Sequence, residues 1–466
     1  MVRIGYSGHR GHLSERLMST FRPIDRGTSY LLPPSVEEWL PQRHLARFVV
    51  ETVEQMDLSQ MTQAYRGSGT VAYHPAMLLG LLIYGYATGE YSSRKIERAT
   101  YDSVAFRFIA ANQHPDHDTL AVFRRRFLPQ IEGLFVQVLQ VAQALGLLKL
   151  GTIALDGTKI KANASKHNAY SHRHALKLEE QLTREVRELL LLAEQADNVP
   201  IPDSLDIPQE LGLREARLAA IREARAQIEA RAAQRLVEQR QAYERKLAAR
   251  KERTGKKQGR PPDPPAAGGP DARDQVNLTD PDSRIMKCAG NLFEQAYNAQ
   301  AAVDADTHLI VGARLSDAAV DAQQLEPMLQ QLQQLPATLG KAKTLLADRG
   351  FYSADNVEAC ERAQLIPLIA LARQTHHAHW SERHREAPSL PDGADALARM
   401  RHRLITPEGR ACYALRKCTP EPVFGIIKSV MRFRQFSLRG LRQVQGEWKL
   451  VAMSWNLKRM FVLATA

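Results

Sequence analysis

Two short apolar runs end in an aspartate followed within two residues by a glycine, and they constrain the fold more than any other feature of this chain. They are TIALDG (152–157) and KTLLADRGF (343–351). Short apolar runs closed by such residues are typical of buried strands. We therefore expect two strands of one sheet, each with a carboxylate at its end.

The segments around these runs alternate between strand-like and helix-like patterns. The patterns predict a β-hairpin with its turn at 304–306, then helix, strand, helix and strand, over 297–317, 321–335, 343–351, 353–364 and 365–370. Three antiparallel strands followed by alternating helices and strands is the order of a ribonuclease-H-like fold. The prediction is an α/β domain with a mixed five-stranded sheet and helices.

A long helical insertion interrupts this domain, which we expect to be split into 151–173 and 284–466. Charged helix formers dominate 174–254, and a proline-containing piece divides them. Three-and-four spacing predicts an antiparallel helical hairpin, with an apolar face formed by Leu218, Ile221, Ala224, Ile228 and Ala232. Proline, glycine and charge in 255–283 favour a flexible linker. A second insertion, at about 372–411, is polar and rich in histidine.

Residues 36–150 read as an all-α module, after an N-terminal tail at 1–35. One helix is expected to begin at Pro75 and to end at Gly89, followed by helices over 93–111 and 119–145 with caps at Ser92 or Ser93 and at Asp118 or Thr119. Basic residues expected to be exposed on these helices are Arg94, Lys95, Arg124, Arg125 and Arg126. They suit a helix-turn-helix-like DNA-binding module, and equally the solvated face of an ordinary helical bundle.

The composition favours a polyanionic partner and a reducing compartment. Sixty-three Lys and Arg against 51 Asp and Glu give a net charge of +12, which attracts nucleic acids. No CxxC pair occurs among the four cysteines, Cys288, Cys360, Cys412 and Cys418. The N-terminus is polar, and the apolar run 76–87 is too short to span a bilayer. We expect a cytoplasmic protein without a membrane partner.

Three carboxylates fall where a metal site can form: Asp156 and Asp348 at strand ends, and Glu421 at the start of a helix. Neighbouring strand ends lie side by side, so the three can converge on one pocket. Two divalent cations about 4 Å apart need such hard anionic oxygens. Gly157 and Gly350 would leave room for a DNA strand beside the aspartates. Each acid alone is also explained as a turn or cap residue.

Five segments together resemble DDE transposases of bacterial insertion sequences. They are DGTKIKANAS (156–165), DPDSRIMK (280–287), YNAQAAVD (297–304), LLADRGFYS (345–353) and EPVFGIIK (421–428), in the family's order. The resemblance spans roughly 20–460 and implies a metal-binding triad of Asp156, Asp348 and Glu421 with two Mg²⁺ or Mn²⁺ ions. It also implies the tyrosine–arginine–glutamate–lysine signature, filled here by Tyr413, Arg416, Glu421 and Lys428.

One spacing departs from the family. Four residues separate Arg416 from Glu421, where three are commonest, so Lys417 is an alternative to Arg416. Downstream, Arg432 and Arg434 belong to a basic segment, completed by Arg439, Arg442, Lys458 and Arg459, that suits contact with the DNA backbone. Trp448 and Trp455 are expected in the core instead. Zinc at His376, His377, His379 and His384 is a rival site, although its spacing matches no structural zinc pattern.

The resemblance implies a bacterial, nucleoid-associated transposase that binds the terminal inverted repeats of its element and joins them to target DNA. Two ends must be paired, so a homodimer on double-stranded DNA is expected. No glycine loop for a nucleotide is seen. The alternatives are a nuclease with the same triad, a non-catalytic DNA-binding derivative, and a coiled-coil scaffold that explains only 174–254.

Overall fold

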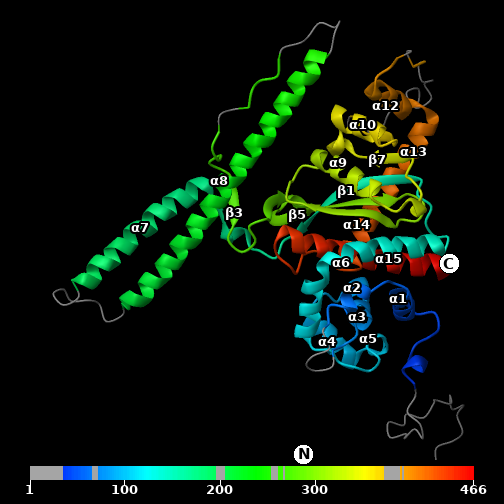
Figure 1. The fold of residues 1–466 in the computed structure, drawn as a ribbon, viewed down its shortest axis with the longest axis horizontal. Coiled ribbons are helices and arrows are strands. Elements are labelled where there is room, and N and C mark those ends of the chain that lie inside the picture. Colours follow the sequence, from blue (N-terminus) through cyan, green and yellow to red (C-terminus); the bar gives the residue numbers. More distant parts are fainter. Residues whose placement is uncertain are drawn as a thin grey trace, which may run out of the picture.

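The computed structural model describes residues 35–65, 72–195, 205–252, 261–265, 268–371, 389–390 and 393–465. A helical region, a sheet with helices on both sides, and a long two-helix arm follow one another across the molecule (Figure 1). The histidine group proposed as a zinc site, at 376–384, lies outside the described residues. Within them, no helix is both long and apolar enough to cross a membrane.

The N-terminal region is built from helices α1 to α6, at Leu45–Glu54, Ser59–Thr62, Pro75–Thr88, Ser93–Asp102, Val104–Ile109 and His117–Ala144. The predicted limits of α3 are confirmed: Pro75 is its first residue, and Gly89 ends it with φ +92°. The single helix expected over 93–111 is wrong, because the extended backbone of Ser103 separates α4 from α5. The predicted cap of α6 is also wrong: Asp116 Oδ1 accepts the hydrogen bond from Thr119 N.

Helix α6 docks this region onto the C-terminal helix α15 (Leu441–Thr465). Arg124, expected to be exposed, is 8% exposed, which corrects the prediction. Its Nη1 donates to Tyr86 Oη (3.0 Å), and that hydroxyl donates to the fully buried Glu447 of α15 (2.9 Å). The same Nη1 also donates to the carbonyl of Tyr91 (3.2 Å), and the nearby charge of Glu447 favours the buried guanidinium. The two regions therefore share one buried polar network.

The sheet holds the predicted strands in mixed orientation. Its strands are β1, β4, β5, β6, β7 and β8, at Thr152–Lys161, Arg284–Lys287, Phe293–Asp304, Ile310–Ser316, Thr344–Ala347 and Ile366–Ile369. Their order is β4-β5-β1-β7-β8, and β6 pairs with the same side of β5 as the short β4. Strands β1, β7 and β8 run parallel, and β5 and β6 form the predicted hairpin. The ribonuclease-H-like fold is confirmed, with β4 as a sixth, short strand.

Strand β1 does not end at Asp156, as the sequence suggested, but continues to Lys161. Its parallel pairing with β7 stops at Leu155, opposite Ala347. Its antiparallel pairing with the longer β5 continues, with Gly157 opposite Gln300. Asp156 is thus the first residue of β1 beyond its pairing with the shorter strand β7. It therefore lies beside the end of β7.

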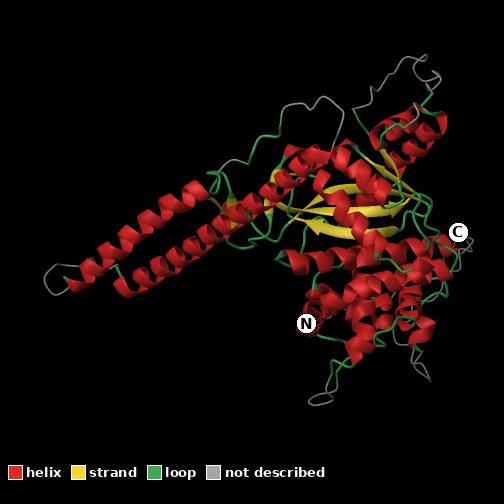
Figure 2. Ribbon diagram, turned by 45° about the horizontal axis from the view of Figure 1, so that its top comes forward, coloured by secondary structure: helices red, strands yellow, loops and turns green. Residues whose placement is uncertain are grey.

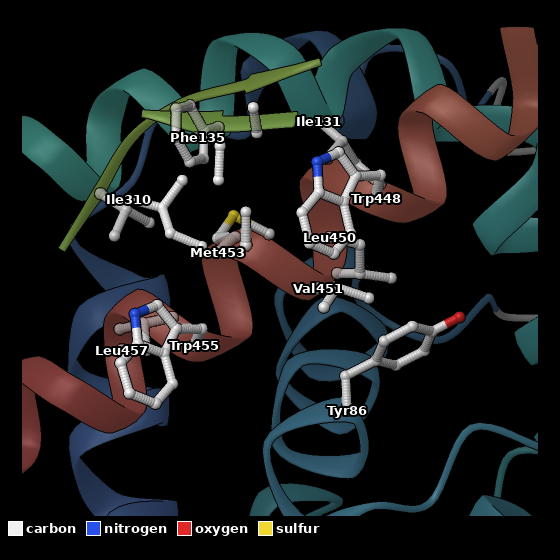
Figure 3. Packing of buried hydrophobic residues seen from close by; sticks show 14 of the residues in the cluster. Tyr86, Ile131, Phe135, Ile310, Trp448, Leu450, Val451, Met453, Trp455 and Leu457 are labelled. Atoms are coloured by element: carbon white, nitrogen blue, oxygen red, sulfur yellow. The ribbon is translucent and has the colours of Figure 1, made fainter. Parts of the chain in front are cut away.

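Helices cover both faces of the sheet (Figures 1 and 2). Besides α15, they are α9, α10, α12, α13 and α14, at Leu325–Gln333, Ala354–Arg362, Ala396–Ile405, Pro407–Cys418 and Pro420–Ser429. Figure 3 shows α15 at the centre of the core, where Trp448 and Trp455 are 0% and 5% exposed. Their indole N–H groups donate to the carbonyls of Gln300 and His308. The prediction that both tryptophans are core residues is confirmed.

The arm consists of α7 (His172–Glu194) and the longer α8 (Ile207–Glu252), which project from the sheet (Figure 2). The predicted apolar face of α8, from Leu218 to Ala232, is buried against α7 and against β3 (Gln275–Asn277). Strand β3 pairs with β2 (Ala169–Ser171) at the base of the arm. A purely flexible linker over 255–283 is therefore wrong, since this segment supplies a strand.

Candidate active site

Asp156 and Asp348 occupy corresponding positions on two adjacent parallel strands. Asp348 follows Ala347, the last residue of β7, and Ala347 pairs with Leu155, the residue before Asp156. Because side chains alternate between the faces of a sheet, the two carboxylates emerge on the same face. Asp348 Oδ1 accepts from Gly350 N at 2.8 Å, and Asp156 Oδ1 accepts from Gly157 N at 2.8 Å.

In the protein without a bound cation, the charged form of Asp156 is unfavourable beside Asp348. Burial, with added repulsion from Asp348 and Asp321, raises the pKa of Asp156 to about 7. The hydrogen bond from Gly157 N and the charge of Arg416 oppose this rise and do not cancel it. Burial is thus the main reason why the charged form of Asp156 is unfavourable, and the two neighbouring aspartates add to it.

Asp321, which the sequence reading did not single out, is a third aspartate at this edge. Its Oδ1 accepts three hydrogen bonds: from Lys159 Nζ (3.1 Å), Asn298 Nδ2 (2.7 Å) and Gln300 Nε2 (2.8 Å). Its Oδ2 lies 3.7 Å from the position that a Cβ on Gly350 would take. Asn298 and Gln300 are two residues apart in β5 and therefore lie on the same face of the sheet, where both donate to Asp321.

Gly157 makes this arrangement possible. A Cβ at Gly157 would lie 2.2 Å from Gln300 Nε2 and 2.8 Å from Asp321 Oδ1, closer than real contacts allow. The expected opening for DNA beside Gly157 is therefore filled by the chain's own amide and carboxylate. Gln300 is fully buried, and its Oε1 has no partner among the described residues. Such an unsatisfied buried oxygen costs free energy unless a ligand or water bonds to it.

Glu421 lies in the first turn of α14, as predicted, and pairs with Arg416 of α13. Arg416 Nη2 lies 3.1 Å from Glu421 Oε1, and the arginine side chain is 14% exposed. Arg416 therefore contacts Glu421 and its charge acts on Asp156, whereas Lys417 is exposed on the same helix.

Lys428 and Tyr413 contact the same strand ends. Lys428 Nζ donates to Thr158 Oγ1 and, at 3.1 Å, to the carbonyl of Lys159, both on β1. Burial lowers the pKa of Lys428, against the attraction of Asp156. Tyr413 is 8% exposed, and its hydroxyl lies 3.4 Å from the carbonyl oxygen of Ala347. Tyr413 is thus placed to support β7.

The remaining predicted DNA contacts do not join this cluster. Arg432 and Arg434 are exposed on the segment after α14, and Arg434 Nε donates to the carbonyl of Lys428 at 3.0 Å. Arg94 and Lys95 are exposed on α4, in the helical region below the sheet (Figure 1). Of the downstream basic residues, Lys458 and Arg459 donate to backbone carbonyls of Ala87 and Thr307.

The donor set fits a hard divalent cation, although its three acids are not gathered around one point. In the described part of the chain, no three His, Cys, Asp or Glu side chains lie close enough together to hold a metal ion. Glu421 is turned toward Arg416 instead. Carboxylate oxygens are the ligands that Mg²⁺ and Mn²⁺ prefer, and the mutual repulsion of Asp156 and Asp348 is what a cation would relieve.

Comparison with known proteins finds a transposase family model in the N-terminal helical region and another over most of the C-terminal region. The ribonuclease-H-like sheet carries Asp348 directly after β7 and Asp156 beside it in β1, an acidic pair that suits a polynucleotidyl transferase. A model described as a transposase DDE domain matches residues 277–457, and one described as a transposase domain (DUF772) matches 34–126. The chain belongs to the DDE transposases of insertion-sequence type, which are enzymes of DNA transposition.

The matched DDE range contains two of the three proposed metal ligands. Asp348 and Glu421 lie within the DDE range, whereas Asp156 precedes it, on the other side of the arm. No curated protein sequence and no solved structure matches the chain.

Proposed function

We propose that this transposase binds the terminal inverted repeats of a bacterial insertion sequence, cleaves DNA at the element ends and joins the freed 3′ hydroxyls to target DNA. The supporting observation is the pair Asp156 in β1 and Asp348 directly after the adjacent parallel strand β7, with Glu421 in the first turn of α14, a helix that packs against β1. Two Mg²⁺ or Mn²⁺ ions bound there would activate the attacking oxygen and stabilise the leaving oxygen. Asp156, Asp348 and Glu421 are the proposed ligands.

Other residues of the cluster take supporting roles in this proposal. Arg416 pairs with Glu421, and its guanidinium is proposed to bind a phosphate of the DNA beside the acids. Lys428, tied to β1 through Thr158, places an ammonium group beside the scissile phosphate. Tyr413 supports the backbone that precedes Asp348. These residues fill the tyrosine–arginine–glutamate–lysine signature, and we assign the chain to that branch.

The proposal extends to how DNA is gathered. Exposed Arg94, Lys95, Arg432 and Arg434 are proposed to contact the phosphate backbone of duplex DNA. Joining two ends requires two active sites, so the functional form is proposed to be a homodimer on paired ends. Its place of action would be the bacterial cytoplasm, at the nucleoid.

The test is cleavage of a labelled fragment that carries one element end, by the wild type and by Asp348→Ala, with Mg²⁺ or Mn²⁺. We expect cleavage by the wild type alone, leaving 3′ hydroxyls that join to plasmid DNA. Cleavage without joining would identify a nuclease. Binding without cleavage by either protein would identify a non-catalytic DNA-binding derivative, and equal cleavage by the variant would exclude the proposed triad.

A further inference from the structure

A cavity of about 480 Å³ lies at the seam between helices α6 and α15, and its charged lining is mainly basic. Arg125 and Arg126 line it from α6, and Arg442 and Lys449 from α15, with Glu132 as its one acidic lining residue. Arg125, Arg126 and Arg442 are exposed. The cavity is thus built from both transposase regions, since Arg125 and Arg126 fall in the first matched range and Arg442 and Lys449 in the second.

The two helices approach closely beneath the cavity, so its walls are held at a fixed separation. A Cβ added at Gly446 of α15 would lie 2.8 Å from Leu128 Cδ2 on α6. On the α6 wall, the Arg126 guanidinium lies over the ring of Tyr65 at 5.2 Å and donates to the carbonyl of Ala64. A site with positioned cations binds an anion without first having to order them.

Positive charge at the base of the cavity exceeds the negative charge available to balance it. Lys449 is 5% exposed and donates to Glu132, whose own side chain is 64% exposed. Arg314 of β6 lies near the same carboxylate, and its Nε is buried without a partner among the described residues. Burial lowers the pKa of both Lys449 and Arg314. The exposed carboxylate of Glu132 is therefore the shared counter-charge of Lys449 and Arg314. Buried cations normally have more acceptors or opposite charges around them.

We infer that this cavity binds backbone phosphates of duplex DNA, so that a single duplex contacts the N-terminal region and the catalytic domain at once. Exposed Arg125 and Arg442 supply guanidinium groups at the rim, which suit phosphate oxygens, and the buried Lys449 supplies a point charge below them. The inference rests on the proposed DNA-binding function and adds the place where the duplex crosses from one region to the other.

Binding and catalysis can be separated by measuring affinity in EDTA with Asp348→Ala as the parent protein. Fluorescence anisotropy of a labelled duplex of mixed sequence would be recorded at several salt concentrations for Arg125→Gln and Arg442→Gln. We expect each to weaken binding by about 3- to 10-fold and to reduce the slope of log K against log salt by about 1, as the loss of one phosphate contact predicts. Arg362→Gln, an arginine on α10 that is 66% exposed, is the matched control and should leave both unchanged.

Glu132→Gln separates a phosphate site from a simple structural ion pair, because only a phosphate site predicts tighter DNA binding by this variant. In a phosphate site, removing the carboxylate leaves Lys449 and Arg314 uncompensated and tightens DNA binding. If the pair only ties α6 to α15, the variant binds DNA no better and melts at a lower temperature. The inference is overturned if Arg442→Gln behaves like Arg362→Gln, or if Glu132→Gln does not tighten DNA binding, whatever its melting temperature.

The test of the phosphate site does not depend on the outcome of the cleavage test. If the wild type does not cleave element ends but the rim variants still lose affinity, the phosphate site stands and the triad falls. If cleavage depends on Asp348 while the rim variants bind normally, the triad stands and the duplex crosses elsewhere.

Discussion

The arm and the catalytic edge of the sheet are both rich in charged residues, but the charges are arranged differently in the two regions. On the arm, Glu179 accepts from Arg222 and Arg225, and Arg214 pairs with Glu185. Farther along α8, Arg235 pairs with Asp274 beside β3, so charges of opposite sign link α8 both to α7 and to the base of the arm. At the catalytic edge, by contrast, aspartates face one another, and the pKa of one of them is raised to about 7.

This difference distinguishes structural support from a binding site. Exposed ion pairs contribute little stability, and they orient α7 on α8 without creating any demand for a ligand. Like charges held together are unfavourable, and a fold tolerates them where a ligand of opposite charge relieves them. The same criterion selects the cavity between α6 and α15, with the sign reversed. Variants at the two kinds of place should therefore differ sharply in their effects.

The largest effect is expected from Asp156→Asn. Removing one carboxylate from a two-metal site deprives the transition state of several kcal/mol of stabilisation, so cleavage should fall by roughly 10³-fold or more. DNA binding in EDTA should be retained or slightly strengthened, because a negative charge is lost. The matched control is Asp306→Asn, on the exposed β5–β6 turn, which should cleave normally. Comparable loss in both variants would show that the aspartates act through stability alone.

Asp321→Asn should have the next largest effect. Its Oδ1 receives donors from β1 and β5 behind Gly157, so an amide there disturbs the support of Asp156 without removing a proposed ligand. Loss of such support typically costs about 10- to 100-fold in activity or metal affinity. Cleavage should recover as Mn²⁺ is raised, which a merely unfolded variant would not do. Asp317→Asn, on the same segment and paired with Arg284, should retain activity at all metal concentrations.

The pH dependence of stability should show the cost of burying the charge of Asp156, with a smaller contribution from Asp348, in metal-free protein. The folded-state pKa of Asp156 is about 7, above its ordinary value of 3.8, so the folded state binds the proton more tightly. The associated stability is present below pH 3.8 and is lost as pH rises through 7, by an amount on the order of 4 kcal/mol, because each pKa unit corresponds to about 1.4 kcal/mol. Asp156→Asn should lack this loss and melt at a higher temperature than the wild type at pH 8.

Adding Mg²⁺ at pH 8 provides the matching control. The ion should stabilise the wild type and leave Asp156→Asn nearly unchanged, because the variant has neither the charge nor the full ligand set. If the wild type and the variant show the same pH profile without metal, the charge at Asp156 is already balanced, and the contrast with the arm fails.

Local sequence patterns predicted the elements of this fold well, and the contacts between distant elements poorly. The apolar spacing of α8, the β5–β6 hairpin and the limits of α3 follow from residues near one another in sequence. The length of β1 beyond Asp156 depends instead on how far β5 extends, and the burial of Arg124 depends on Tyr86 and Glu447. Neither of these is set by the local pattern alone.

The candidate site shows the same division. Asp156 and Asp348 could be predicted because each follows an apolar run, and Glu421 because it opens a helix. Asp321 could not be ranked above other loop aspartates, because its importance comes from Asn298 and Gln300 some twenty residues earlier. A signal for Arg124 was present and unused: it lies four residues after Leu120, on the apolar face of α6.

The smallest effect is expected on the arm, where Glu179→Gln removes the carboxylate shared by Arg222 and Arg225. Glu179 is partly buried while both arginines reach solvent, so the cost should be about 1 kcal/mol or less. Hydrogen exchange should show faster opening of α7, with unchanged protection of the sheet and unchanged cleavage of a single DNA end. Paired-end joining can still fall if the arm orients a partner subunit. A large loss of single-end cleavage would instead mean that the paired charges of the arm serve the chemistry itself, and charge pairing would no longer distinguish support from site.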